Sequence, residues 1–167
     1  MRIRKGQLND IQKLVFLDRA AYGEYGANEE YFKQKLTSPN THVLIFEKRS
    51  KVSGFTVFEF MEPHQTPENF SDLQLMKPMK GKWMHIIAFT TETNYKDIHA
   101  DTRLLKAAEN LARELRSTVF CVPLSKNHPY PAAFNFFEGN GYQKVGTIQW
   151  LANSNEKIDC YFYSKSV

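Results

Sequence analysis

A strand, a helix and a second strand follow one another between residues 83 and 122, and this unit limits the fold more than any other segment. Residues 83–89 are apolar except at His85, which is typical of a strand buried on both faces. Residues 119–122, Val-Phe-Cys-Val, predict a second buried strand. Apolar residues recur between them at helical spacing, at Leu104, Leu105, Ala108, Leu111, Ala112 and Leu115. A right-handed crossover between parallel strands follows, and its first loop is where an α/β sheet binds anions.

The remaining segments place this unit in a larger sheet. Periodicity and turn residues predict helices at about residues 10–21, 29–36 and 132–138, and strands at 2–4, 42–48, 52–60, 142–151 and 158–164. Turns are expected at 49–51 and 153–155. The expected fold class is therefore α/β (α+β).

Length and composition fit one globular domain spanning residues 1–167. The chain has 167 residues, of which 42% are hydrophobic and 24% charged, values that exclude a disordered chain or a coiled coil. Residues 62–82 contain three prolines and break the rhythm of strands and helices. A connection of that length predicts a loop insertion that serves as a lid or a binding loop.

Charge and cysteine content restrict the partners and the compartment. The net charge is +4, and the basic residues do not alternate with aromatic ones, which argues against a nucleic-acid partner. No segment is long and apolar enough for a membrane span, and the first residues do not form a secretory signal. Cys121 and Cys160 are far apart in strand-like runs, so buried thiols and a cytoplasmic location are expected. The histidines and cysteines lack metal-site spacing, so no metal is expected.

Several strings resemble the GNAT superfamily of N-acetyltransferases. Residues 3–5 and 9–11, Ile-Arg-Lys and Asn-Asp-Ile, look like the start of its first strand and helix. Residues 136–142, Phe-Phe-Glu-Gly-Asn-Gly-Tyr, resemble its late F-Y-E-x-x-G-F helix and turn, and residues 83–116 have the position and length of its cofactor-binding motif. The resemblance implies a mixed, twisted sheet of six to seven strands flanked by helices on both faces. The fourth and fifth strands of that sheet would splay apart, with acetyl-CoA bound in the opening as co-substrate.

The resemblance also implies which residues meet acetyl-CoA. The main chain of the fourth strand would pair with pantetheine, the following loop would surround the pyrophosphate, and a late helix would lie beside the pantetheine. On this chain these positions are Phe89, Thr90 and Thr91; Lys96, Asp97, Ile98, His99, Ala100, Asp101 and Thr102; and Phe137.

The loop departs from the family pattern basic-x-x-Gly-x-Gly/Ala. Lys96 keeps the cation, but His99 and Asp101 stand where the family has small residues. Glycines there let the backbone approach phosphates closely. We expect Asp101 to act as the N-cap of the helix. A capping carboxylate would also occupy the anion position, so CoA would have to bind with the loop shifted, with help from Lys96 and His99, or bind weakly.

Acid and base chemistry have two candidates. His85 is the titratable side chain inside the fourth strand, and histidine suits a general base near neutral pH. A core histidine bonded to the backbone, or paired with Cys121 on the next strand, is its alternative role, and Glu92 at the strand end is expected to be solvated. Phe137 falls where many family members place a proton-donating tyrosine, so Tyr130 or water would protonate the leaving thiolate. The alternative for Tyr130 is a packed loop aromatic.

The resemblance thus predicts an N-acetyltransferase that moves an acetyl group from acetyl-CoA to a primary amine of a small molecule or peptide. Backbone N–H groups of the fourth strand would stabilise the oxyanion. The amine is expected near Tyr22, Tyr25 and Tyr31, under the 62–82 loop, and a homodimer is compatible with this arrangement. The altered loop and Phe137 support a different hypothesis, a catalytically impaired GNAT-fold binding or regulatory module.

Overall fold

The computed structural model describes residues 1–68, 70, 80–152 and 156–167. Its strands are β1 (Arg2–Lys5), β2 (Thr41–Lys48), β3 (Lys51–Met61), β4 (Trp83–Thr91), β5 (Val119–Ser125), β6 (Gln143–Leu151) and β7 (Lys157–Ser166). Its α-helices are α1 (Ile11–Tyr22), α2 (Glu29–Thr37), α3 (Ile98–Glu114) and α4 (Ala132–Gly139), with short 3-10 turns at Leu8–Asp10 and Gly23–Tyr25.

The strands form one seven-stranded sheet in the order β1-β2-β3-β4-β5-β7-β6. Neighbouring strands are antiparallel except for β4 and β5, which are parallel and joined by α3. The mixed sheet and the crossover through α3 confirm the fold class expected from the sequence. The β2–β3 hairpin turns at Arg49 and Ser50, whose φ angles of 53° and 62° are those of a tight two-residue turn.

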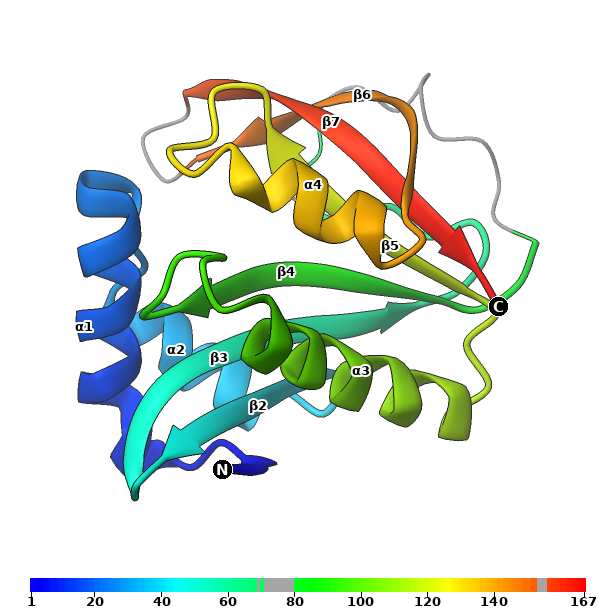
Figure 1. The fold of residues 1–167 in the computed structure, drawn as a ribbon. Helices are drawn as coiled ribbons and strands as arrows, with labels where there is room; N and C mark the ends of the chain where they lie inside the picture. Colours follow the sequence, from blue (N-terminus) through cyan, green and yellow to red (C-terminus); the bar gives the residue numbers. More distant parts are fainter. Residues whose placement is uncertain (69, 71–79, 153–155) are drawn as a thin grey trace.

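Helices cover both faces of the sheet. Apolar residues of α1 and α2, such as Leu14 and Phe32, pack with β2 and β3 in one buried cluster. Residues of α3 and α4, such as Leu104 and Phe136, share a second cluster with the opposite face of β2–β4 and with β5. Figure 1 shows α3 and α4 in front of the sheet and α2 behind it. The apolar face of α3 therefore packs against the parallel strands β4 and β5.

The predicted insertion at 62–82 lies partly outside the described residues, as does the predicted turn at 153–155. Phe70, which is described, is buried and forms an isolated bridge with Trp150 of β6. Its ring packs against Phe162 of β7, with centroids 6.2 Å apart. In the part of the chain that the structure describes, no helix combines the length and apolarity that crossing a membrane requires.

A buried carboxylate joins α3 to the C-terminal strands. Glu109 of α3 is 2% exposed; it accepts a hydrogen bond from the Tyr142 hydroxyl at 2.9 Å and pairs with the Lys165 ammonium of β7 at 3.1 Å. Burial and the nearby Glu109 charge raise the pKa of Tyr142, which keeps its hydroxyl a donor. The three groups satisfy one another across the two halves of the sheet.

Glu109→Ala should therefore lower the free energy of unfolding by about 3 to 5 kcal/mol, because it leaves a buried hydroxyl and an ammonium without their acceptor. Urea unfolding at pH 7 measures the change. Glu114→Ala, at an exposed position of the same helix, is the matched control and should change stability by less than about 0.5 kcal/mol. Equal effects of the two substitutions would show that Glu109 does not join the two halves.

Candidate functional site

β4 and β5 separate soon after they meet. They pair from Trp83↔Val119 to His85↔Cys121, and beyond that β4 remains paired with β3 while β5 remains paired with β7. The space between residues 86–91 and residues 122–125 is called the β4–β5 wedge below; Figure 1 shows it widening toward α1. A strand edge that loses its neighbour presents main-chain N–H and C=O groups to a ligand. The wedge is therefore the candidate site.

Buried rings fill the side of the wedge that faces α3 and α4. Phe89, Tyr95, Phe136 and Phe137 are each at most 6% exposed and belong to one apolar cluster. The centroid of the Phe137 ring lies 5.8 Å from that of Phe89 and 6.4 Å from that of Tyr95. Phe137 is 0% exposed, so the ring expected to lie beside a ligand is inside the core. A ligand that enters here must move these rings.

Tyrosine hydroxyls line the wide end of the wedge. The Phe89 carbonyl accepts hydrogen bonds from Tyr95 at 3.2 Å and from Tyr22 at 3.4 Å, while Tyr130 donates to the Ala21 carbonyl at 3.0 Å. Burial raises the pKa of Tyr22 and Tyr95, so both hydroxyls stay protonated. Tyr22 and Tyr130 had been expected near the site. Tyr95 had not, although it directly precedes the Lys96 loop.

His128 is a second residue that sequence reasoning missed. Its ring lies 5.8 Å from Tyr22 and 6.0 Å from Tyr95, measured between centroids. Its Nδ1 accepts a hydrogen bond from the Tyr130 N–H at 3.0 Å, which places the proton of the neutral ring on Nε2. Burial lowers the pKa of His128 to about 4, so the ring is uncharged at neutral pH. It can donate a hydrogen bond there without acting as an acid.

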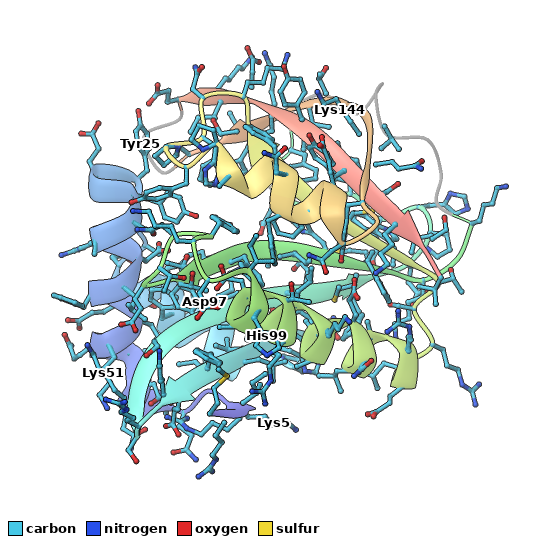
Figure 2. All side chains as sticks on the ribbon, in the orientation of Figure 1. Lys5, Tyr25, Lys51, Asp97, His99 and Lys144 are labelled. Carbon is cyan, nitrogen blue, oxygen red and sulfur yellow. The ribbon has the colours of Figure 1, made fainter. Side chains whose placement is uncertain are left out.

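The residues after β4 form the N-terminus of α3. Asp97, and not Asp101, is the N-cap: its Oδ1 accepts a hydrogen bond from the Ala100 N–H at 3.1 Å. The expectation that Asp101 caps the helix is therefore wrong, because the helix begins at Ile98, one turn earlier. Ile98, His99 and Lys96 are exposed, and Figure 2 shows Asp97 and His99 at the start of the helix.

Asp101 is buried in the first turn of α3. It is 1% exposed, and its Oδ2 has no hydrogen-bond partner among the described residues. Burial raises the pKa of Asp101 to about 6; a hydrogen bond from Thr91 opposes this rise, and the charge of Asp97 adds to it. Thr102, the last residue of the predicted pyrophosphate loop, is half-buried on the same helix.

The end of β4 is tied to α1. Thr90 donates its hydroxyl to Asp18 of α1 at 2.9 Å, and Asp18 also accepts the Ala27 N–H at 2.7 Å. Burial raises the pKa of Asp18 despite these two hydrogen bonds. Thr91 is buried, and its hydroxyl lies 3.4 Å from that of Thr93. The side chains of Thr90 and Thr91 are thus engaged inside the protein, and the Thr91 carbonyl accepts a hydrogen bond from the Asn94 N–H at 3.2 Å.

His85 lies at the closed end of the wedge on the face opposite α3. Its Nδ1 is 3.0 Å from Glu59 Oε1 on β3, and its Nε2 is buried without a partner among the described residues. His85 therefore bonds a carboxylate and not the backbone. Burial works to raise the pKa of Glu59, but the hydrogen bond and charge of His85 bring it below its usual value. Glu59 was missed because its position opposite His85 depends on strand register, which a long connection does not determine.

Cys121 of β5 lies opposite His85 of β4, which agrees with the alternative in which His85 pairs with Cys121. The Cys121 thiol is buried, however, and burial raises its pKa well above the usual value. Both cysteines are free and buried. The thiol of Cys121 therefore stays protonated and is a poor nucleophile. No cluster of His, Cys, Asp or Glu that could hold a metal ion occurs among residues 1–68, 70, 80–152 and 156–167.

The tyrosines expected near the amine lie in different surroundings. Tyr25 is 47% exposed and donates its hydroxyl to Glu156, which precedes β7, at 3.0 Å. Tyr31 lies on α2, and burial raises its pKa, with the charges of Asp18 and Glu59 adding to the rise.

Glu92 is exposed, and its carboxylate lies 3.7 Å from the Lys51 ammonium, as expected of a solvated carboxylate. A cavity of about 390 Å³ opens elsewhere, between α1 and the ends of β3 and β4, lined by Lys13, Phe16, Lys51, Glu92 and Asn94 among others.

Comparison with known proteins finds no matching family model and no matching curated protein sequence. Among solved structures, Arabidopsis thaliana NAA60 in complex with acetyl-CoA superposes with a TM-score of 0.77 at 13% identity, over 99% of this chain and 98% of that one. The ribosomal-protein-S18-alanine N-acetyltransferase of Escherichia coli gives a TM-score of 0.72 at 10% identity, over 99% and 93%. A GCN5-related N-acetyltransferase of Rhodopseudomonas palustris gives 0.70 at 18%, over 99% and 95%. The chain has the GNAT fold.

The Glu59–His85 pair predicts a pH-dependent contribution to stability. Glu59→Gln should lower the free energy of unfolding at pH 7 by on the order of 1 kcal/mol, because it removes the charge that pairs with the imidazole. The pKa of Glu59 is depressed in the folded state, so the difference from wild type should shrink as the pH falls below about 4.5. Urea unfolding from pH 3.5 to 7 measures both. Glu30→Gln, exposed on α2, is the control, and a Glu59→Gln effect independent of pH would rule out the pairing.

Proposed function

We propose that this chain is a GNAT-type N-acetyltransferase, a single domain that transfers an acetyl group from acetyl-CoA to a primary amine of a small molecule or peptide. The observation that carries the proposal is the β4–β5 wedge, where the parallel pairing of β4 with β5 ends at His85↔Cys121 and residues 86–91 continue without a β5 partner. The full-length superposition on an acetyl-CoA complex supports the same use of the wedge. The free, buried thiols of Cys121 and Cys160 support a cytoplasmic location.

The residues present fit acetyl-CoA along most of its length. The edge of β4 offers main-chain N–H and C=O groups to a pantetheine chain, and the first turn of α3 offers the N–H groups of Ile98 and His99 to phosphates. Lys96 adds a cation beside that turn. Asp101 is the residue that does not fit, since an ionised carboxylate repels phosphates. When bound, acetyl-CoA would supply an acetyl thioester.

The residues of this chain then have distinct tasks. Main-chain N–H groups of β4 stabilise negative charge on the acetyl oxygen. His85 accepts a proton from the amine at Nε2, and Glu59 fixes the ring through Nδ1. Tyr130 or a water molecule returns a proton to the departing sulfur, because Phe137 has no hydroxyl to give.

A second candidate function is a GNAT-fold binding or regulatory module without turnover. Two observations favour it: the rings that fill the wedge, including the fully buried Phe137, and the carboxylate of Asp101 at the phosphate end. Both would prevent acetyl-CoA from entering. The two functions differ in whether the acetyl group is transferred. Ligand-induced stabilisation therefore tests first whether acetyl-CoA binds, and a transfer assay then tests turnover.

Acetyl-CoA should raise the midpoint of thermal unfolding. At one hundred times its dissociation constant a ligand stabilises a fold by about 2.7 kcal/mol, which corresponds to a rise of about 2–4 °C for a chain of this size. Differential scanning fluorimetry at pH 5.5 and at pH 7.5 measures it, with acetate at an equal concentration as the control. A rise at either pH supports the enzyme.

Transfer itself is then tested with a panel of primary amines by following free CoA thiol. His85→Gln should abolish transfer and keep the acetyl-CoA shift, because Nε2 acts on the amine and not on the donor. A wild-type protein that shows no shift at millimolar acetyl-CoA, or a shift without transfer to any amine, would be the binding module.

A further inference from the structure

Asp101 is a buried polar group that neither the helix cap nor the core explains. The cap of α3 is Asp97, so the first turn already has its acceptor. Asp101 follows inside the same turn at 1% exposure, and its Oδ2 has no partner among the described residues. An unpaired buried acceptor costs about 1–3 kcal/mol. Because this cost lowers the stability of the fold, we ask whether Asp101 has a role in ligand binding.

The groups that face Asp101 leave its charge uncompensated. From β4 it meets the Thr91 hydroxyl, and from the β4–α3 loop the phenol of Tyr95 and the carboxylate of Asp97. Its helix neighbours Ala100 and Leu104 belong to the apolar cluster that includes residues of β2, β3 and α4. None of the ion pairs within the described residues includes Asp101, and the nearby Lys96 and His99 side chains are exposed. Burial therefore dominates and raises the pKa of Asp101 to about 6.

The same position is where an anion would bind. The first N–H groups of α3 and the helix dipole favour phosphate at this end, and an ionised Asp101 sets a negative charge beside them. A neutral Asp101 removes that repulsion. The two protonation states therefore have opposite effects on a phosphate ligand.

We propose that Asp101 is a proton-controlled gate on the donor site: the diphosphate of CoA binds at the N-terminus of α3 when this carboxyl group is neutral and is repelled when it is ionised. The proposal rests on the proposed function, because it concerns the same ligand. On this proposal, the protonation state of Asp101 decides whether the wedge binds a nucleotide diphosphate. A chain with the GNAT fold could then bind CoA even though Asp97 and Asp101 lie at the phosphate end.

Calorimetric titration with CoA tests the gate. If only the neutral form binds, affinity falls tenfold for each pH unit above the pKa, so the wild-type dissociation constant should rise about 100-fold between pH 5 and pH 8. Asp101→Asn is nearly isosteric and does not titrate; it should bind CoA tightly throughout that range. Asp97→Asn keeps the cap acceptor but removes a charge that raises the pKa of Asp101, so its loss of affinity should begin at lower pH.

The outcomes separate the gate from the function. Wild-type binding that does not depend on pH refutes the gate and leaves the enzyme. Equal pH dependence in wild type and Asp101→Asn assigns the dependence to the phosphates of CoA and also refutes the gate. If no protein binds CoA at any pH, the proposed function fails and the gate fails with it.

A stability measurement guards against a misfolded variant. A carboxyl group whose pKa is raised by folding loses stability as the pH rises through that pKa, and asparagine does not. The free energy of unfolding of Asp101→Asn relative to wild type should therefore increase from pH 4 to pH 7.5. A relative stability that stays constant over this range would show that Asp101 does not titrate as the gate requires, and Asp101→Ala, which also removes the carboxyl group, repeats the test.

Discussion

The early separation of two parallel strands is the constraint on which the other features depend. β4 and β5 pair from Trp83↔Val119 to His85↔Cys121, and each then continues with a different antiparallel neighbour. Because α3 joins these two strands, its N-terminus lies at the wide end of the wedge (Figure 1). A free strand edge and a helix N-terminus thus meet in one place. Both kinds of group bind the polar parts of an extended, phosphorylated ligand.

Two sets of contacts hold the halves of the sheet together over this opening. On the α3 side, Glu109 takes a hydrogen bond from Tyr142 and an ion pair from Lys165, and the Phe137 ring packs against Phe89. These contacts compensate for the strand pairing that the wedge lacks. They also close the wedge, so that entry of a ligand requires rings to move. The candidate site is therefore closed by packed side chains in this structure.

The sequence contained the elements of the fold but only part of the site. The apolar run at 83–89 and the spacing from Leu104 to Leu115 predicted the crossover unit, because burial and helical period act locally. The N-cap was placed one turn late, at Asp101, because the resemblance was counted onto the loop without its φ and ψ angles. Tyr95, His128 and Glu59 reach the site from separate loops and strands, and only the tertiary register brings them there.

The central claim is that the wedge is an acetyl-CoA site whose phosphate end is controlled by Asp101. A crystal structure grown at pH 5.5 with acetyl-CoA tests it most directly. The account predicts density for pantetheine along residues 86–91 of β4, the diphosphate at the N–H groups of Ile98 and His99, and Phe137 displaced from its position against Phe89. A wedge that remains filled by the same rings at saturating acetyl-CoA, or a ligand bound elsewhere, would contradict the claim.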